Sequence, residues 1–258
     1  MSRLPAIFAG HGSPYNLYDQ NPFTKSLQDL GDDLFKRYKP DAIVIISAHW
    51  MTTGTHLTGE DDPKMEYDYY NFPKKFYDYV YPAKGSAKIA KKISQLLPDI
   101  INLSDEWGID HGATIILENI IPSGEIPVIE LSLDKQKSPQ DHFELGQKLA
   151  KFRDENILFI GSGNLIHTFR ELSQDIHAKP FEWAMELDAT QKQAIDSYDI
   201  DLLVNYEKIP LSRRGFQTNE HYLPMLYIMG MKREEEEIRY IFEGFQHGSA
   251  SHRSFIIE

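Results

Sequence analysis

Residues 42–50 of the chain read AIVIISAHW. Ala42 to Ile46 form a continuous apolar run, which is typical of a strand buried on both faces of a sheet. Polar groups follow at once, among them His49, where we expect this strand to end. The same pattern, an apolar run followed by polar residues, occurs three more times, at Ala6–Ala9, Val128–Leu133 and Ile157–Ile160.

The stretches between these runs show helical periodicity over 23–34 and 89–97, and 139–152 is a third candidate helix. Strands that alternate with helices predict an α/β fold with a central, mostly parallel sheet flanked by helices. Near the end of the chain, Ile238–Phe242 and Phe255–Ile257 predict an antiparallel pair. Because no long linker interrupts the pattern, we expect a single domain over residues 1–258.

The composition narrows the class of function. Of 258 residues, 39 are acidic and 27 basic, and the formal net charge of −12 argues against a nucleic-acid partner. No apolar stretch approaches the roughly 18 residues of a membrane helix, so we expect a cytoplasmic protein without a membrane partner. The chain has no cysteine, so histidine and carboxylate would have to hold any transition metal. We therefore expect chemistry on small molecules.

In open α/β sheets, ligands bind beyond the carboxyl ends of the strands. A single histidine is more often a satisfied polar residue than a metal ligand, but several that converge on one rim favour a site. The flanking glycines permit a tight turn at His11, and an apolar strand leads to His49, so we interpret both as ligands. The four polar ends are GHGSP at 10–14, SAHW at 47–50, Ser132 with Asp134, and GSGN at 161–164 with His167 close behind.

His221 lies in TNEHYLP at 218–224, where Thr218 or Asn219 could cap a short helix that runs to about Met229. From this segment alone, a metal ligand and a merely solvated histidine are equally good interpretations. No two histidines have the HExxH spacing, so the fold itself would have to assemble the site. Three imidazoles leave coordination positions open, as a catalytic centre requires.

Two further histidines, His111 and His167, are candidates for proton transfer because histidine titrates near neutral pH, with a structural role as the alternative for each. The aromatic segment Tyr67–Tyr81 would suit a wall or lid over a flat ring, although ordinary loop packing explains it nearly as well. The remaining histidines lack a comparable context and are interpreted as structural or surface residues: His56, His142, His177, His247 and His252.

Together, these motifs resemble the DODA-type extradiol ring-opening dioxygenases of the class III LigB-like superfamily. YPAKG at 81–85 also resembles the YPAPG of that family, with one change. The resemblance implies an oxidoreductase with one divalent metal per chain, which opens a small, DOPA-like catechol next to the diol and places both atoms of O₂ in the product. The motifs span nearly the whole chain: GHGSP at 10–14, SAHW at 47–50, WGIDHG at 107–112, SGNLIH at 162–167 and EHYLP at 220–224.

The resemblance also implies roles for individual residues. By similarity, His11, His49 and His221 hold the metal. His167 is an acid/base catalyst or a fourth ligand, and His111 contacts the substrate or oxygen. The residues expected to contact the catechol stand in the same motifs: Ser13, Trp50 and Tyr222.

One position departs from the better-known members of the superfamily, which complete two histidines with a glutamate, whereas His221 beside Glu220 stands at the matching position here. An all-histidine set has no anionic ligand, so both non-haem Fe(II) and Zn(II) stay open as the metal. Two alternatives also stay open: a zinc-dependent hydrolase on the same three histidines and a non-enzymatic metal-binding protein of this superfamily. The sequence leaves the particular catechol and the oligomeric state open.

Overall fold

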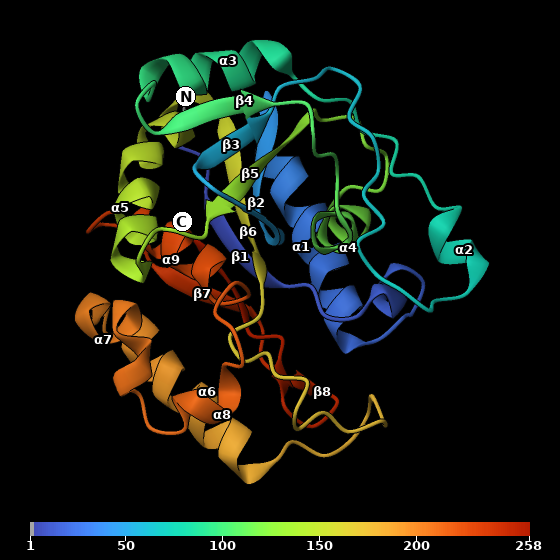
Figure 1. Cartoon of the computed structure of the whole chain (residues 1–258), viewed down its shortest axis with the longest axis vertical. Helices are drawn as coiled ribbons and strands as arrows, with labels where there is room; N and C mark the ends of the chain where they lie inside the picture. Colours follow the sequence, from blue (N-terminus) through green and yellow to red (C-terminus); the bar gives the residue numbers. More distant parts are fainter. Residues whose placement is uncertain (1–2) are drawn as a thin grey trace.

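The computed structural model describes residues 3–258. At its centre lies an eight-stranded sheet with the strand order β4-β3-β5-β2-β6-β1-β10-β7 (Figure 1). The predicted α/β fold is confirmed. The strands of this sheet are β1 Ala6–Gly10, β2 Ala42–Thr52, β3 Thr55–Thr58, β4 Ile101–Ser104, β5 Val128–Asp134, β6 Ile157–Gly163, β7 Ile238–Phe242 and β10 Ser254–Ile257.

The four apolar runs form the parallel core of the sheet. β2 pairs in parallel with both β5 and β6, and β6 pairs in parallel with β1. β3 and β4 were not predicted, because each has only four residues and β4 exposes Asn102 and Leu103 instead of burying an apolar run. The predicted C-terminal antiparallel pair is confirmed as β7 and β10, and β10 also pairs antiparallel with β1.

Helices cover both faces of the sheet, as Figure 1 shows. Because side chains alternate along a strand, Ile43 and Ile45 of β2 face one apolar core and Val44 and Ile46 face the other. The first core is closed by α1 Pro22–Arg37 and α4 His111–Ile120. The second is closed by α3 Ala87–Leu96, α5 Pro139–Leu149, α6 Glu182–Asp196 and α9 Leu223–Gly230.

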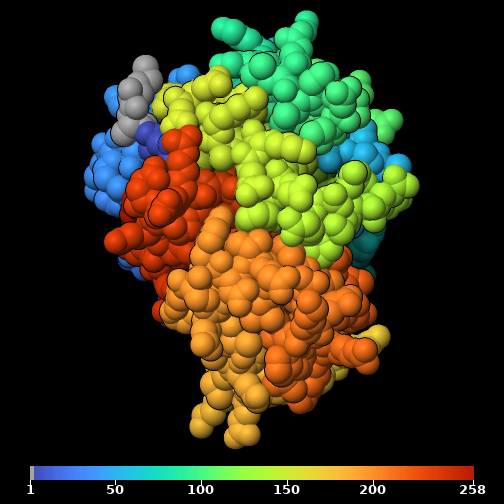
Figure 2. Space-filling view, turned by 90° about the vertical axis from the view of Figure 1, so that its left-hand side faces the viewer, coloured from blue at the N-terminus to red at the C-terminus, as the bar shows by residue number. Residues whose placement is uncertain are grey.

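The chain between β6 and α9 forms one end of the molecule, drawn in orange in Figures 1 and 2. Its helices α6, α7 Ile200–Val204 and α8 Ser212–Gly215 were not predicted. Within residues 3–258, no helix has the length and apolarity needed to cross a membrane. The remaining short elements are α2 Lys74–Tyr77, the 3-10 helices η1 Pro14–Leu17, η2 Ala150–Glu155 and η3 Tyr206–Lys208, and a hairpin of β8 Phe245–Gln246 with β9 Ala250–Ser251.

Candidate metal centre

The carboxyl edge of the parallel strands carries two of the predicted ligands. His11 directly follows β1, and its backbone N–H donates to the carbonyl of Gly163 at the end of β6 (3.1 Å). His49 lies inside β2, which continues beyond its predicted end at Ile46. The register of β2 against β5 shifts between Ile46 and Met51, so the strand is irregular around His49. Such a bulge re-aims a side chain beside a site.

His221 reaches the same edge from the loop before α9. Its backbone carbonyl accepts a hydrogen bond from the N–H of Asn164 (2.9 Å), which ties the loop to the end of β6. The predicted cap by Thr218 or Asn219 is wrong, because α9 begins after His221 and has no side-chain cap. His221 therefore lies just before α9 and is not part of the helix.

The three imidazoles converge. Their ring centroids lie 4.9 Å (His11 to His49), 5.2 Å (His11 to His221) and 5.0 Å (His49 to His221) apart. One ring nitrogen of each lies within 4.8 Å of the others. The fold thus brings together three residues that are up to 210 positions apart in the sequence.

Hydrogen bonds fix which nitrogen of His11 faces this point. Ser162 donates its hydroxyl proton to the carbonyl of Gly112 (2.7 Å), so its oxygen accepts from Nδ1 of His11 (2.9 Å). The proton of His11 is therefore on Nδ1, and Nε2 carries a lone pair toward the other two rings.

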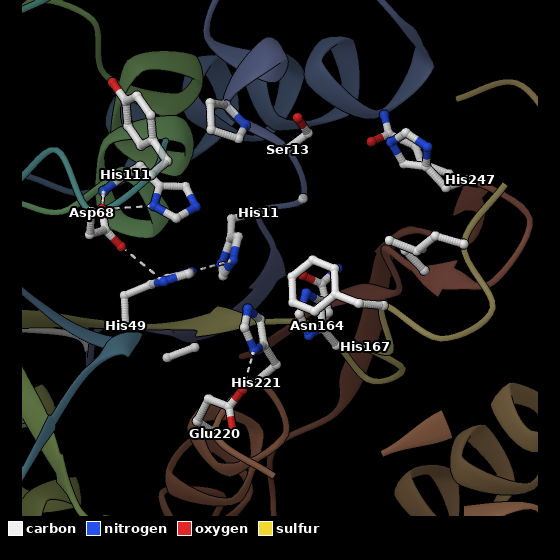
Figure 3. Close-up of a pocket in the computed structure, with 18 of the residues that line it drawn as sticks. His11, Ser13, His49, Asp68, His111, Asn164, His167, Glu220, His221 and His247 are labelled. Atoms are coloured by element: carbon white, nitrogen blue, oxygen red, sulfur yellow. Dashed lines mark hydrogen bonds and ion pairs between the residues drawn. The ribbon is translucent and has the colours of Figure 1, made fainter. Parts of the chain in front are cut away.

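In the other two histidines, a carboxylate faces Nδ1 of the ring (Figure 3). Nδ1 of His49 lies 2.9 Å from Oδ2 of Asp68, and Nδ1 of His221 lies 3.2 Å from Oε1 of Glu220. Metal-bound histidines in proteins almost always donate their other N–H to such a group, which fixes the ring and raises its basicity. His11 and His221 show this arrangement as hydrogen bonds, and His49 shows it as a close ion-pair contact with Asp68.

Charge and burial fit a bound cation. Burial and the neighbouring His49 lower the pKa of His11 well below its usual value, and burial lowers the pKa of His221 to about 4. Burial also acts on His49, but the contact with Asp68 and the charge of Asp110 outweigh it and raise its pKa. Nε2 of His11 and Nε2 of His49 lie 3.1 Å apart. Two lone pairs at that distance repel unless a proton or a metal ion lies between them.

His111 begins α4 beside these three rings. Asp110 caps the helix through the N–H of Ala113 (2.9 Å), and its own N–H donates to the buried Glu130 (2.8 Å). Nδ1 of His111 donates to Oδ1 of Asp68 (2.8 Å). Burial opposes ionisation of Asp68, but His111 and His49 hold the pKa of its carboxyl well below the usual range. One carboxylate thus orients a predicted ligand and a predicted proton-transfer residue together.

His167 stacks on His221, with ring centroids 3.6 Å apart and an angle of 12° between the planes. Burial, together with His221, lowers the pKa of His167 to about 2, so the ring is neutral. Phe169 packs edge-on against its other side (4.8 Å). His167 is therefore held at the cavity between an aromatic ring and a candidate ligand.

Two glycines permit the close approach of these groups. A β-carbon at Gly112 would lie 3.0 Å from the ring of His49 and 3.1 Å from Nδ1 of His11. At Gly12, which has a positive φ of 66°, it would lie 2.1 Å from the ring of His252. The tight turn predicted beside His11 is thus present at Gly12, where left-handed backbone favours glycine.

The cluster opens into a cavity of about 610 Å³ that all five predicted histidines line. Ser13 also lines it, as do Tyr69 and Phe72 of the aromatic segment. Trp50 and Tyr222 do not. The Trp50 ring stacks on Trp107 (6.0 Å), while Tyr222 is fully buried and donates its hydroxyl to the carbonyl of Leu203 (3.0 Å).

Trp50 follows His49 in the strand β2, where neighbouring side chains point to opposite sides of the sheet. Tyr222 has helical backbone angles at the start of α9, and its ring packs in the apolar core. The polar end of β5, the third polar strand end, does not line the cavity. Its Ser132 hydroxyl bonds instead to Thr52 (2.7 Å) and to the N–H of His56 (2.8 Å).

Several site residues were missed. Asp68 stands in the aromatic segment, where nothing in the sequence pairs it with His49 or His111. His247 and His252 were interpreted as structural or surface residues, and the structure places both of them in the lining of the cavity. His247 lies in the turn of the β8–β9 hairpin, and His252 lies in the loop after it. This part of the chain folds back against the end of β1, and only the tertiary structure reveals the placement.

Two other groups of three side chains are also close enough to hold an ion: His49, Asp68 and His111, and His167, Glu220 and His221. In each of them, the carboxylate is already engaged with a histidine Nδ1. The set of His11, His49 and His221 is the one whose three Nε2 atoms remain available, and it fits a divalent metal best.

Comparison with known proteins agrees with this arrangement. Residues 1–253 match the family model described as the catalytic LigB subunit of aromatic ring-opening dioxygenase. The 4,5-DOPA dioxygenase extradiol of Escherichia coli (strain K12) is 38% identical over 258 residues, covering 97% of this chain and 93% of the relative. The protein of that name from Beta vulgaris is 31% identical over 255 residues, covering 96% and 94%.

A crystal structure of an uncharacterized protein from Escherichia coli K12 has the same fold, with a TM-score of 0.86 and 37% sequence identity. The match covers 99% of this chain and 100% of that one. The similarity thus extends over the whole architecture and is not confined to the motifs.

Proposed function

The chain belongs to the LigB family of aromatic ring-opening extradiol dioxygenases, a family of oxidoreductases, and from that premise we propose that it opens a small catechol with O₂ at a divalent metal held by His11, His49 and His221. The observation that carries this proposal is the matched anchoring of the three rings. The Nδ1 of each ring lies within 3.2 Å of a side-chain oxygen, and one ring nitrogen of each lies within 4.8 Å of the others.

The three imidazoles can hold either Fe(II) or Zn(II), and the O₂ chemistry of the proposed reaction selects Fe(II) as the working metal. A divalent metal bound there supplies Lewis acidity toward the two catechol oxygens and, as Fe(II), the electrons that O₂ activation requires. No carboxylate is among the three ligands, but Asp68 and Glu220 stand one hydrogen bond behind two of them. Their negative charges compensate much of the charge of the metal, as a directly bound carboxylate would.

The remaining residues handle protons and position the ring. His111 and His167 line the cavity on two sides of the cluster (Figure 3). We assign to the neutral His167 the proton that a catechol hydroxyl releases, because a bound metal would lower the pKa of that hydroxyl and so let even a weakly basic imidazole accept its proton. Asp68 fixes Nδ1 of His111, so its Nε2 is available to a bound oxygen atom. Tyr69 and Phe72 supply an apolar wall for the flat ring.

The overall reaction balances without an external reductant. The carbon–carbon bond next to the diol breaks, and both atoms of O₂ enter the product, which carries an aldehyde and a carboxylic acid. The two relatives named 4,5-DOPA dioxygenase extradiol make DOPA the first catechol to test.

The test is an assay of protein reconstituted with Fe(II) without air, then mixed with O₂ and a panel of catechols that includes DOPA. We expect a coloured, ring-opened semialdehyde, no product without O₂, and no product from His11→Ala protein. If the protein consumed no catechol but hydrolysed esters with Zn(II) in the absence of O₂, the zinc hydrolase interpretation would replace this one.

A further inference from the structure

The strand β5 carries a buried carboxyl group that does not line the cavity. Glu130 is only 1% exposed, and its side chain contacts the segment that leads into α4. No step of the proposed reaction involves it. A buried ionisable group needs a physical reason, because moving an unpaired charge from water into the protein interior is costly.

Glu130 accepts two hydrogen bonds from this segment. Oε1 accepts from the backbone N–H of Asp110 (2.8 Å), and Oε2 accepts from the indole N–H of Trp107 (3.2 Å). Both donors are neutral, and among the ion pairs of residues 3–258 none includes Glu130. A buried carboxylate without a cationic partner is unfavourable, so this environment favours the protonated acid.

The carboxylate of Asp110 can accept that proton in a hydrogen bond. Asp110 is fully buried, and its Oδ1 accepts from the N–H of Ala113 (2.9 Å). Its Oδ2 has no hydrogen-bond partner among residues 3–258. Burial and the neighbouring carboxyl of Asp110 raise the pKa of Glu130 well above its usual value. The two side chains together therefore carry one proton and one negative charge.

The segment 107–110 also pairs with the segment 64–68. The N–H and the carbonyl of Ile109 each bond to a backbone group of that segment (2.8 Å). Asp68, at its end, accepts from the backbone N–H (3.2 Å) and from Nδ1 (2.8 Å) of His111. The two segments thus fix His111 together, and the buried carboxyl on β5 anchors the first of them.

The charges around the metal site agree with a neutral acid at this position. Asp68 and Glu220 already face the histidine cluster and compensate the charge of a divalent metal there. Within residues 3–258, Glu130 forms no hydrogen bond or ion pair with His11, His49 or His221. The charge of a metal therefore acts on Glu130 only at longer range, where the carboxylate of Asp68 offsets it.

We propose that Glu130 is a positioning residue for ring opening: as a neutral carboxylic acid, it accepts from the N–H of Asp110, donates its proton to the carboxylate of Asp110, and so holds His111 in place at the cavity. This inference rests on the proposed function, because that function places His111 beside a bound oxygen atom. Glu130 touches neither metal nor substrate and acts only through the segment that leads into α4.

The experiment uses full-length protein loaded with Fe(II) and compares the wild type with Glu130→Gln and Glu130→Met. Glutamine is neutral and has the shape of the acid, and its amide can still accept from the N–H of Asp110 and donate to its carboxylate. Methionine has a similar length but offers only a weak acceptor. The matched control is Ser132→Ala, which removes another buried polar group of β5 that does not line the cavity.

The first measurement is the infrared difference spectrum between the wild type and Glu130→Gln. We expect the carbonyl band of a protonated carboxylic acid, present from about pH 6 to about pH 8, where an ordinary glutamate is ionised. The difference between the wild type and Ser132→Ala should lack this band. Carboxylate bands in its place would overturn the inference, because Glu130 would then be an anion.

The second measurement is steady-state kinetics with methylcatechol, with metal analysis of the same samples. Glu130→Gln should keep kcat within about threefold of the wild type, because it keeps the bonds to Asp110. Glu130→Met leaves the N–H and the carboxylate of Asp110 unpaired, and kcat should fall about tenfold or more. KM should change less than kcat, and metal content should stay the same, because Glu130 contacts neither substrate nor ligands. Ser132→Ala should keep kcat and KM.

An equal loss of kcat in Glu130→Gln and Glu130→Met would overturn the inference, because the charge of Glu130 would then matter and not its hydrogen bonds. An unchanged kcat in Glu130→Met would also overturn it. If thermal unfolding shows that Glu130→Met does not fold, Glu130→Asp takes its place. It keeps the acid but shortens its reach by one carbon, and the same fall in kcat is expected.

Failure of the proposed function gives a different result. If wild-type protein opened no catechol ring, that function would fall, and the infrared band would still test Glu130. Amide hydrogen exchange followed by mass spectrometry would test the anchoring of the segment 107–114. It should become faster in Glu130→Met and stay unchanged in Glu130→Gln. Unchanged exchange in both variants would overturn the inference.

Discussion

The two ends of the cavity are built in different ways. At the end near β1, β2 and β6, His11 and His221 are buried and each predicted ligand has its Nδ1 held by another residue. At the other end, His247 lies in a hairpin turn. Phe169 lies in a loop, and the residue itself is 71% exposed. Groups that need fixed geometry are supported by the sheet, whereas the groups at the other end are carried on segments that tolerate change.

The largest expected effect is at the rigid end. His49→Ala removes one of three nitrogen donors, and we expect metal content to fall to a small fraction of one per chain. Ring opening should fall by about a thousandfold or more, because the lost metal contributes several kcal/mol to the reaction. Elemental analysis and turnover measured on the same samples check this. The exposed His177→Ala should keep both, and a His49→Ala protein with full metal and activity would remove His49 from the site.

A smaller effect is expected at Asp68, which contacts the predicted ligand His49 but is not itself one of the three predicted ligands. Asp68→Asn keeps the size of the side chain but removes the charge that faces His49 and His111. Loss of such a supporting group typically weakens metal affinity about 10- to 100-fold. Titration of metal-free protein against a chelator of known affinity measures the change.

The matched control for Asp68 is Asp78→Asn in the same aromatic segment, where the carboxylate pairs with the exposed Lys74. We expect unchanged metal affinity for this variant. If both substitutions weakened the metal equally, the effect would come from the net charge of the segment and not from the contacts of Asp68.

The smallest effect is expected at the loop end. Phe169→Ala removes a ring that packs edge-on against His167 and lines the cavity. An aromatic contact of about 1 kcal/mol corresponds to a fall of about fivefold in kcat/KM, which we expect mainly in KM. Steady-state kinetics with one catechol, together with metal analysis, test this. Loss of metal from Phe169→Ala protein would contradict the division between the two ends.

The sequence predicted the rigid end better than the loop end, for a physical reason. His11 and His49 follow long apolar runs, and the ends of neighbouring parallel strands meet at one edge, so local pattern and topology place them together. His221 depended on the family resemblance, because the helix cap assumed for it is absent. Even at this end, no residue pattern indicated that Asp68 would reach His49, since the fold of the intervening loop sets that contact.

The position of the C-terminal hairpin beside the cavity could not be predicted from the residue pattern. His247 and His252 lie more than 230 residues from His11, and their approach to the cavity follows from the antiparallel return of β10 beside β1. Conversely, the family resemblance implied that Trp50 contacts the substrate, whereas its ring stacks on Trp107 and does not line the cavity. A motif identifies a residue, but the backbone geometry around it decides where its side chain points.

The central claim is that the three anchored histidines hold a metal at which O₂ opens a catechol ring. The most direct measurement is a single reaction of Fe(II)-loaded protein with methylcatechol under isotopically labelled O₂, trapped at once by reduction of the aldehyde and analysed by mass spectrometry. We predict a ring-opened product that carries both labelled oxygen atoms. A product without label, or unchanged catechol in the presence of bound Fe(II), would contradict the claim.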